Sequence, residues 1–243
     1  MAAVKAAIGD AVLTSLWVFS LPCRGVLSSM AVRFLGVQSL ALARLFITTI
    51  VASVFVLTFN VAGGAMGGAS FNPATTISSY AAGLKPNWTL LSMAIRFPAQ
   101  AAGAVGGAKA ILQLIPTQYK HMIKGPSLKV DLHTGAVVEG VLNFVFNLTI
   151  FVVMLRGPKS LFLQVWLISV VTVGLFIAGS GYTGPSINPA NAFGWAYVNN
   201  LHNNWEFFYV YWIGPLIGAI SAAFVFRLLF QVPVQQKQKK KKA

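Results

Sequence analysis

Six long apolar stretches dominate the chain, with polar or turn-forming residues between them. The stretches lie near Ala6–Val26, Leu40–Val61, Leu90–Ile115, Gly135–Leu155, Leu161–Ile177 and Phe207–Phe230. A helix of about 20 apolar residues, rising ~1.5 Å per residue, crosses the ~30 Å hydrocarbon core of a bilayer. The pattern therefore predicts an all-α membrane protein with six transmembrane helices.

Two shorter apolar segments, residues 72–83 and 188–199, follow the second and the fifth stretch. Each begins with the same tripeptide, as Asn72-Pro73-Ala74 and as Asn188-Pro189-Ala190. Asn is a favoured N-cap and Pro fits the first helical position, so a single copy is explained as an ordinary helix start. Ten helical residues reach only ~15 Å, about half of the hydrocarbon core. Two copies at matching places therefore predict two re-entrant half-helices.

The order span, span, half-helix, span occurs twice, which predicts an internal repeat. Because each copy crosses the membrane an odd number of times, the second copy is expected to be inverted. The expected division is a first repeat at 1–115, a connecting loop at 116–132, a second repeat at 133–230 and a basic cytosolic tail at 231–243.

Matched residues support the duplication. Asp10 in the first span corresponds to Glu139 in the fourth, and Gly103 in the third span corresponds to Gly218 in the sixth. Small residues let helix backbones approach closely in lipid. Interrupted apolar segments at corresponding places of two halves are a sequence pointer to a transport site.

Composition and charge exclude several classes of protein. The chain is 56% hydrophobic and only 9% charged, against roughly 25% charged residues in soluble domains. One cysteine excludes an intrachain disulfide, and no catalytic triad, phosphate loop or metal cluster is visible, so neither an enzyme nor a cofactor or metal site is indicated. Part of the net charge of +14 comes from the lysine-rich tail, and no basic fold with base-reading residues is visible. The charge therefore does not indicate a nucleic-acid-binding protein.

Basic residues indicate the orientation. The tail lysines, with Arg156 and Lys159 between the fourth and fifth spans, are expected in the cytosol, whereas Arg33 and Lys129 fall in loops of the other side. With six spans, both termini are therefore predicted to be cytosolic.

The two tripeptides predict how a pore would work. At its centre, the amides of Asn72 and Asn188 would offer N–H donors, and each half-helix would direct roughly half a positive charge there. Non-helical backbone before each half-helix would line the cavity with carbonyl groups. A water held by both amides would break a proton wire, and the positive helix ends would oppose cations. Without an energy-coupling residue, this indicates a passive pore.

The twin motifs and the sixth-span start Tyr211-Trp212-Ile213-Gly214-Pro215 resemble the aquaporin (major intrinsic protein) family over nearly the whole chain. The basicity and the lysine tail resemble the plant small basic intrinsic proteins of that family. The resemblance implies a water channel, a homotetramer and, through the dilysine signal Lys240 and Lys241, residence in the endoplasmic reticulum membrane. A solvated basic tail attracted to anionic lipid is the alternative explanation of these lysines.

The resemblance also implies roles for individual residues. Asp10 and Glu139 are expected to anchor the loops before the half-helices by accepting backbone N–H bonds. The selectivity filter maps to the four positions Val51, Phe176, Pro185 and Asn191. Most aquaporins carry Arg where Asn191 stands, so the filter is expected to lack its fixed cation.

Two alternatives to a water channel remain at this point. One is a facilitator of small neutral solutes of the glycerol type. The other is a membrane scaffold that keeps the fold while bulky Phe176 closes the pore.

Overall fold

The computed structural model describes residues 2–85 and 88–230, and its regular elements are helices. In chain order they are α1 Ala2–Phe34, α2 Ala41–Ala65, α3 Pro73–Ala81, α4 Leu90–Leu114, η1 Thr117–Met122, α5 Leu132–Arg156, α6 Leu161–Gly179, α7 Pro189–Val198, α8 Trp205–Phe208, η2 Tyr209–Ile213 and α9 Gly214–Phe230. The predicted all-α membrane architecture, with two half-helices at α3 and α7, is confirmed.

Five of the described segments are long and apolar enough to cross a membrane: α1, α2, α5, α6 and the continuous run of α8, η2 and α9. The predicted third span, α4, has 25 residues and is less apolar. It carries Arg96 and Gln100, which are buried inside the protein, where they meet polar partners instead of lipid. Its 25 residues are long enough to cross the hydrocarbon core, and its polar side chains are satisfied inside the protein.

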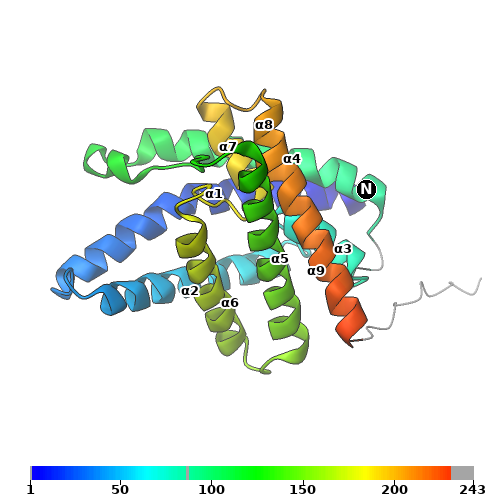
Figure 1. Ribbon diagram of the computed structural model, residues 1–243, viewed down its shortest axis with the longest axis horizontal. Helices are drawn as coiled ribbons and strands as arrows, with labels where there is room; N and C mark the ends of the chain where they lie inside the picture. The colour runs from blue at the N-terminus through cyan, green and yellow to red at the C-terminus, as the bar shows by residue number, and fades with distance from the viewer. Residues whose placement is uncertain (1, 86–87, 231–243) are drawn as a thin grey trace, which may run out of the picture.

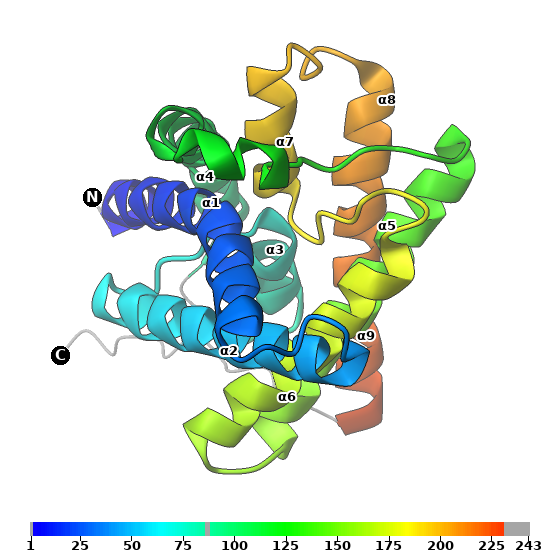
Figure 2. The ribbon, with the colours of Figure 1, turned by 90° about the vertical axis from the view of Figure 1, so that its left-hand side faces the viewer.

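The first span differs from its prediction because α1 continues past Val26 to Phe34. At ~1.5 Å per residue its 33 residues reach ~50 Å, more than the hydrocarbon core. Pro22 lies inside the helix and removes one backbone hydrogen bond. Figure 2 shows that α1 changes direction along its length. Its second part runs beside α2, with which it forms a hairpin, and this hairpin also contacts η1 and α6 (Figure 1).

Glycines let the outer helices of each half approach closely. A Cβ at Gly103 of α4 would collide with the carbonyl oxygen of Ala11 in α1, and one at Gly218 of α9 would collide with that of Gly140 in α5. Gly103 and Gly218 are the two positions that correspond to each other in the predicted internal repeat. α1 therefore packs against α4, and α5 packs against α9 (Figure 1).

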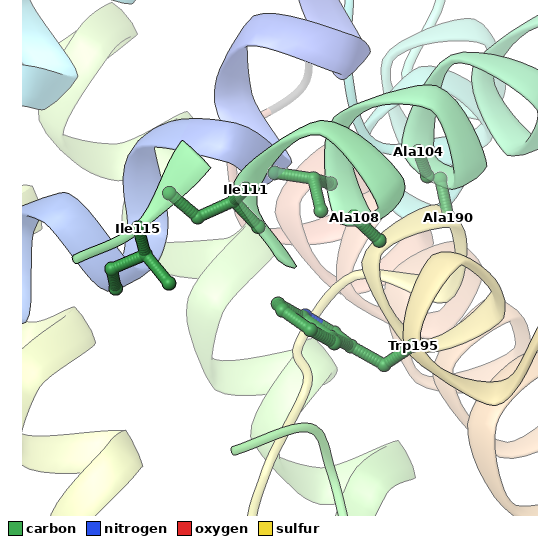
Figure 3. Packing of buried hydrophobic residues seen from close by; sticks show 7 residues of the cluster. Ala104, Ala108, Ile111, Ile115, Ala190 and Trp195 are labelled. Atoms are coloured by element: carbon green, nitrogen blue, oxygen red, sulfur yellow. The ribbon is translucent and has the colours of Figure 1, made fainter. Parts of the chain in front are cut away.

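Each half-helix packs on the long helix of the other half of the chain. α3 lies against α9, and α7 lies against α4. Figure 3 shows Ala104, Ala108 and Ile111 of α4 facing Ala190 and Trp195 of α7. Because each half holds the half-helix of the other, the two Asn-Pro-Ala tripeptides meet inside the molecule. The half-helices are shorter by a residue or more at each end than predicted, since each Asn is the N-cap and the C-terminal residues form turns.

Candidate pore site

The side chains of Asn72 and Asn188 join the two half-helices. Asn72 Oδ1 accepts from Ala74 N at 3.0 Å, and Asn188 Oδ1 accepts from Ala190 N at 3.0 Å, so each caps its own helix. The amide nitrogens donate across the junction, Asn72 Nδ2 to Ile187 O at 2.9 Å and Asn188 Nδ2 to Phe71 O at 2.8 Å. A carboxamide has two N–H groups, so each Asn keeps a second donor beyond the crossing bond.

The residue before the second tripeptide has an unusual backbone. Ile187 has φ 52°, in the left-handed region that a β-branched residue rarely adopts. Its N–H donates to Glu139 Oε2 at 3.3 Å, and its carbonyl accepts from Asn72. Strained backbone persists only where its surroundings hold it, and here bonds on both sides of Ile187 do so.

Asp10 lies at the centre of a buried polar cluster. Its Oδ1 accepts from Ser70 N at 2.8 Å, and its Oδ2 accepts from Arg96 Nε at 2.6 Å and from Gln100 Nε2 at 2.9 Å. A second bond from the Arg96 guanidinium to Oδ1, at 2.8 Å, makes the ion pair bidentate. Asp10 is thus bonded to the loop before α3, as the anchoring hypothesis requires, through a network that includes α4.

Glu139 occupies the corresponding place in the second half. Its Oε1 accepts from Thr183 Oγ1 at 2.8 Å and from Ser186 N at 3.0 Å. Tyr211 of η2 donates to Thr183 O at 2.8 Å, as Arg96 of α4 donates to Gly68 O at 3.4 Å in the first half. Both loops are therefore bonded to an acid and to the last long helix of their own half, but only the first half uses an ion pair.

A cavity of about 440 Å³ runs past the paired amides. Asn72, Asn188 and Phe176 line it, with apolar side chains from α1, α2, α5 and α6. Lys85 and Trp88 also line it. Both residues follow the C-terminal end of α3, whereas Asn72 lies at its N-terminal end. The cavity therefore extends from the junction past the far end of α3.

The structure brings only part of the predicted filter to this cavity. Phe176 and Asn191 line it, whereas Pro185 is buried against Gly179 and does not. Val51 does not line it either, and the neighbouring Ala52 does. Adjacent helical residues point about 100° apart, so a one-residue difference in alignment changes which side chain faces the lumen.

The side chain of Asn191 is fixed on both sides. Its Nδ2 donates to Ser186 Oγ at 3.2 Å, and its Oδ1 accepts from Trp195 Nε1 at 3.2 Å. Ser186 Oγ also lies 2.6 Å from the carbonyl of Asn188, to which it donates. Asn191 thus braces the start of α7 and has little freedom to reach into the lumen.

Several residues of the site were not predicted from the sequence. Arg96 lies in the third span, where the small residue Gly103 is the only one used to support the predicted repeat. Tyr211 lies at the start of the sixth span, where it contributes only to the family resemblance. The signal for Arg96 was available, because an Arg inside an apolar stretch needs an acid, and Asp10 lies inside another span. Nothing in the sequence pattern signalled the stacking of Trp17 on Phe71, whose ring centroids are 4.3 Å apart. Among residues 2–85 and 88–230, no group of three or more His, Cys, Asp or Glu side chains could hold a metal ion.

Comparison with known proteins agrees with this architecture. The model of the major intrinsic protein family matches residues 1–226. Aquaporin SIP1-1 of Zea mays is 54% identical over 243 residues, which cover 100% of this chain and 98% of that protein. Aquaporin SIP1-1 of Arabidopsis thaliana is 46% identical, with 100% of both chains covered.

Among solved structures, the aquaglyceroporin from Plasmodium falciparum has the same fold. It superimposes with a TM-score of 0.66 at 18% identity and covers 94% of this chain and 98% of its own. The resemblance drawn from the twin motifs is thus confirmed along the whole chain. This multi-pass membrane protein belongs to the major intrinsic protein family, the family of the aquaporins.

Proposed function

We propose that the chain forms a passive water pore in the endoplasmic reticulum membrane, with both termini in the cytosol. The observation that carries the proposal is the junction of the two half-helices beside the cavity. There Asn72 and Asn188 each keep an N–H donor while holding the opposite loop, and both residues line the cavity. A water passing them turns its oxygen toward both amides.

Proton exclusion at this junction rests on electrostatics and orientation. Two helix N-termini point at the same place, each with roughly half a positive charge. The residues described as lining the cavity include no acid. Hydronium therefore meets a positive potential, and the oriented water interrupts the hydrogen-bonded chain along which a proton would hop.

A second candidate, a facilitator of small neutral solutes, is favoured by one specific observation. Position 191 carries an amide that is bound to Ser186 and Trp195, and Ala52 and Phe176 supply apolar surface to the same cavity. A cavity without a charged side chain projecting from position 191 is less polar than one with an Arg there. It therefore admits small neutral solutes that a filter with that Arg rejects. A scaffold with a closed pore is the third possibility, and it predicts neither water nor solute flux.

The experiment is osmotic shrinkage of vesicles that contain the purified protein, run in parallel with swelling in glycerol or urea. We expect shrinkage well above that of empty vesicles. Rates equal to those of empty vesicles with a correctly folded protein would support the scaffold, and fast swelling with slow shrinkage would support the solute facilitator.

The substitution Asn191→Arg sharpens this test. An Arg there projects a cation into the cavity, so we expect solute uptake to fall several-fold while water permeability is largely kept. Asn203→Arg, in the exposed loop between α7 and α8, is the matched control and should change neither flux. Equal effects of the two substitutions would show that position 191 does not act in selection.

The family resemblance also supports a homotetramer and retention through Lys240 and Lys241. Both lysines lie outside the described residues. Cross-linking of the protein in its native membrane tests the tetramer, and a ladder that ends at the monomer would contradict it.

A further inference from the structure

Arg24 is a cation inside the first span without an ionic partner. Among the described residues it takes part in no ion pair or hydrogen bond, although hydrogen-bonded Arg side chains occur elsewhere. The chain has four acids, and none is near enough to neutralise it: Asp10 binds Arg96, Glu139 binds the loop before α7, and the other two lie at the starts of α5 and α8. Charges inside membrane spans are costly and are functional candidates for that reason.

The position of Arg24 relates it to the paired amides. Trp17, Leu21 and Arg24 all line the cavity, and their spacing of four and seven residues puts them on one face of α1. Trp17 stacks on Phe71, the residue before Asn72, so it marks the level of the junction. Seven residues further, α1 has advanced by ~10 Å.

Neighbouring contacts tell which half of the cavity Arg24 lies in. Cys23 and Val26, on either side of it, pack against the cluster that contains Trp195 of α7. Trp195 donates to Asn191, the filter position from which the family's cation is missing. Arg24 therefore lies on the α7 side of the amides, in the half of the cavity where Asn191 stands.

Arg24 also lines a second cavity of about 440 Å³ between the second part of α1 and the start of α2. Leu21 is shared by both cavities too, so the two adjoin at this turn of α1. The second cavity has a mixed lining, in which Leu21 and Val32 accompany the polar residues Ser28, Ser29, Gln38 and Thr48. Arg24 thus lies where the second cavity meets the main one.

We propose that Arg24 supplies, from the first helix, the fixed cation that position 191 lacks, and that it makes this end of the pore reject protons and other cations. The inference rests on the proposed water pore. Of the described residues that line the main cavity, Arg24 and Lys85 carry charge, and both are positive. Lys85 is exposed, so salt screens it, whereas Arg24 is only partly exposed and acts through a medium of lower dielectric.

The test uses purified protein in vesicles that contain a pH-sensitive dye. Water permeability and proton leak under a potassium diffusion potential are measured on the same preparation. Arg24→Gln removes the charge and keeps a polar, hydrogen-bonding side chain, although one that is shorter than that of Arg. We expect its proton leak to rise about tenfold or more, because a unit charge several Å away dominates the barrier, with water permeability nearly unchanged.

Matched variants separate charge from structure. Arg33→Gln and Arg44→Gln remove exposed cations of the second cavity that do not line the main one, and they should leave the leak unchanged. Arg24→Lys keeps the charge and should stay close to the parent protein. Adding Asn191→Arg to Arg24→Gln places a cation in the same half of the cavity and should restore proton exclusion.

Each result decides the question. A parental proton leak in Arg24→Gln with intact water flux would overturn the role of Arg24 and leave the water pore standing. Loss of water flux in both Arg24→Gln and Arg24→Lys would show that the side chain holds the fold and does not filter charge. A parent protein without water flux would refute the pore and, with it, the filter cation.

Discussion

At the residue scale, two acids in matched positions serve their loops by different means. Asp10 is paired with a buried Arg96, while Glu139 receives its bonds from Thr183 and two backbone N–H groups. Removing one partner of a buried ion pair leaves an uncompensated charge, which costs about 3–5 kcal/mol. Replacing a carboxylate that accepts neutral donors leaves no such charge. The two halves should therefore respond differently to the same chemical change.

We expect Asp10→Asn to lower the thermal unfolding midpoint in detergent more than Glu139→Gln does. The double variant Asp10→Asn with Arg96→Met removes both charges and should recover part of the loss. Lys109→Gln, an exposed cation on the same helix as Arg96, is the control and should have little effect. A double variant less stable than Asp10→Asn alone would contradict the ion-pair argument.

At the element scale, the close approach of the long helices depends on single glycines. Gly103 and Gly218 face carbonyl oxygens of the neighbouring helix, and no Cβ fits at either position. Gly106 lies one turn from Gly103 on α4, but it is exposed and has only Ser15 Oγ at 3.5 Å from the site of a Cβ. The same substitution at these positions therefore tests packing alone, because helix propensity favours Ala over Gly at all of them.

We expect Gly103→Ala to destabilise the protein by about 1–3 kcal/mol, the usual cost of overpacking, because α1 and α4 must move apart. Gly106→Ala should be neutral or slightly stabilising. Thermal unfolding of both variants in the same detergent checks the difference. Equal midpoints would mean that α1 and α4 have room to separate.

At the scale of the whole molecule, each half is incomplete without the other. α3 packs on α9 and α7 packs on α4, and the amides cross between the loops. The junction therefore exists only when both halves are folded together. Under the function proposed above, location in the cell would depend instead on the tail, whose lysines would be read as a linear signal.

We expect Lys240→Ser combined with Lys241→Ser to release the protein from the endoplasmic reticulum to later membranes, since the dilysine pattern is lost. Lys237→Ser with Lys239→Ser removes the same charge without touching that pattern and is the control. Microscopy of tagged protein beside organelle markers provides the measurement. Equal redistribution by both pairs would favour a general attraction of the basic tail to anionic lipid.

Much of the architecture follows from the sequence by itself. The spans, the two half-helices and their caps depend on apolar length and on adjacent residues, as when Asn72 bonds to the N–H of Ala74 two positions on. Such local patterns predict elements well. The lengths of α1 and of the half-helices were less accurate, because helix ends depend on turns and neighbours.

Only the tertiary structure decided which polar groups meet. Arg96 pairs with Asp10 of another helix, and the amide bonds cross between the two loops. Likewise, Ala52 and Arg24 line a cavity that several helices enclose, and Val51 does not. A one-residue rotation about a helix axis moves a side chain from lumen to lipid, and no local pattern fixes that rotation. The sequence by itself determined where helices form and that two of them stop halfway. The packing of one half against the other determined which side chains line the cavity between them.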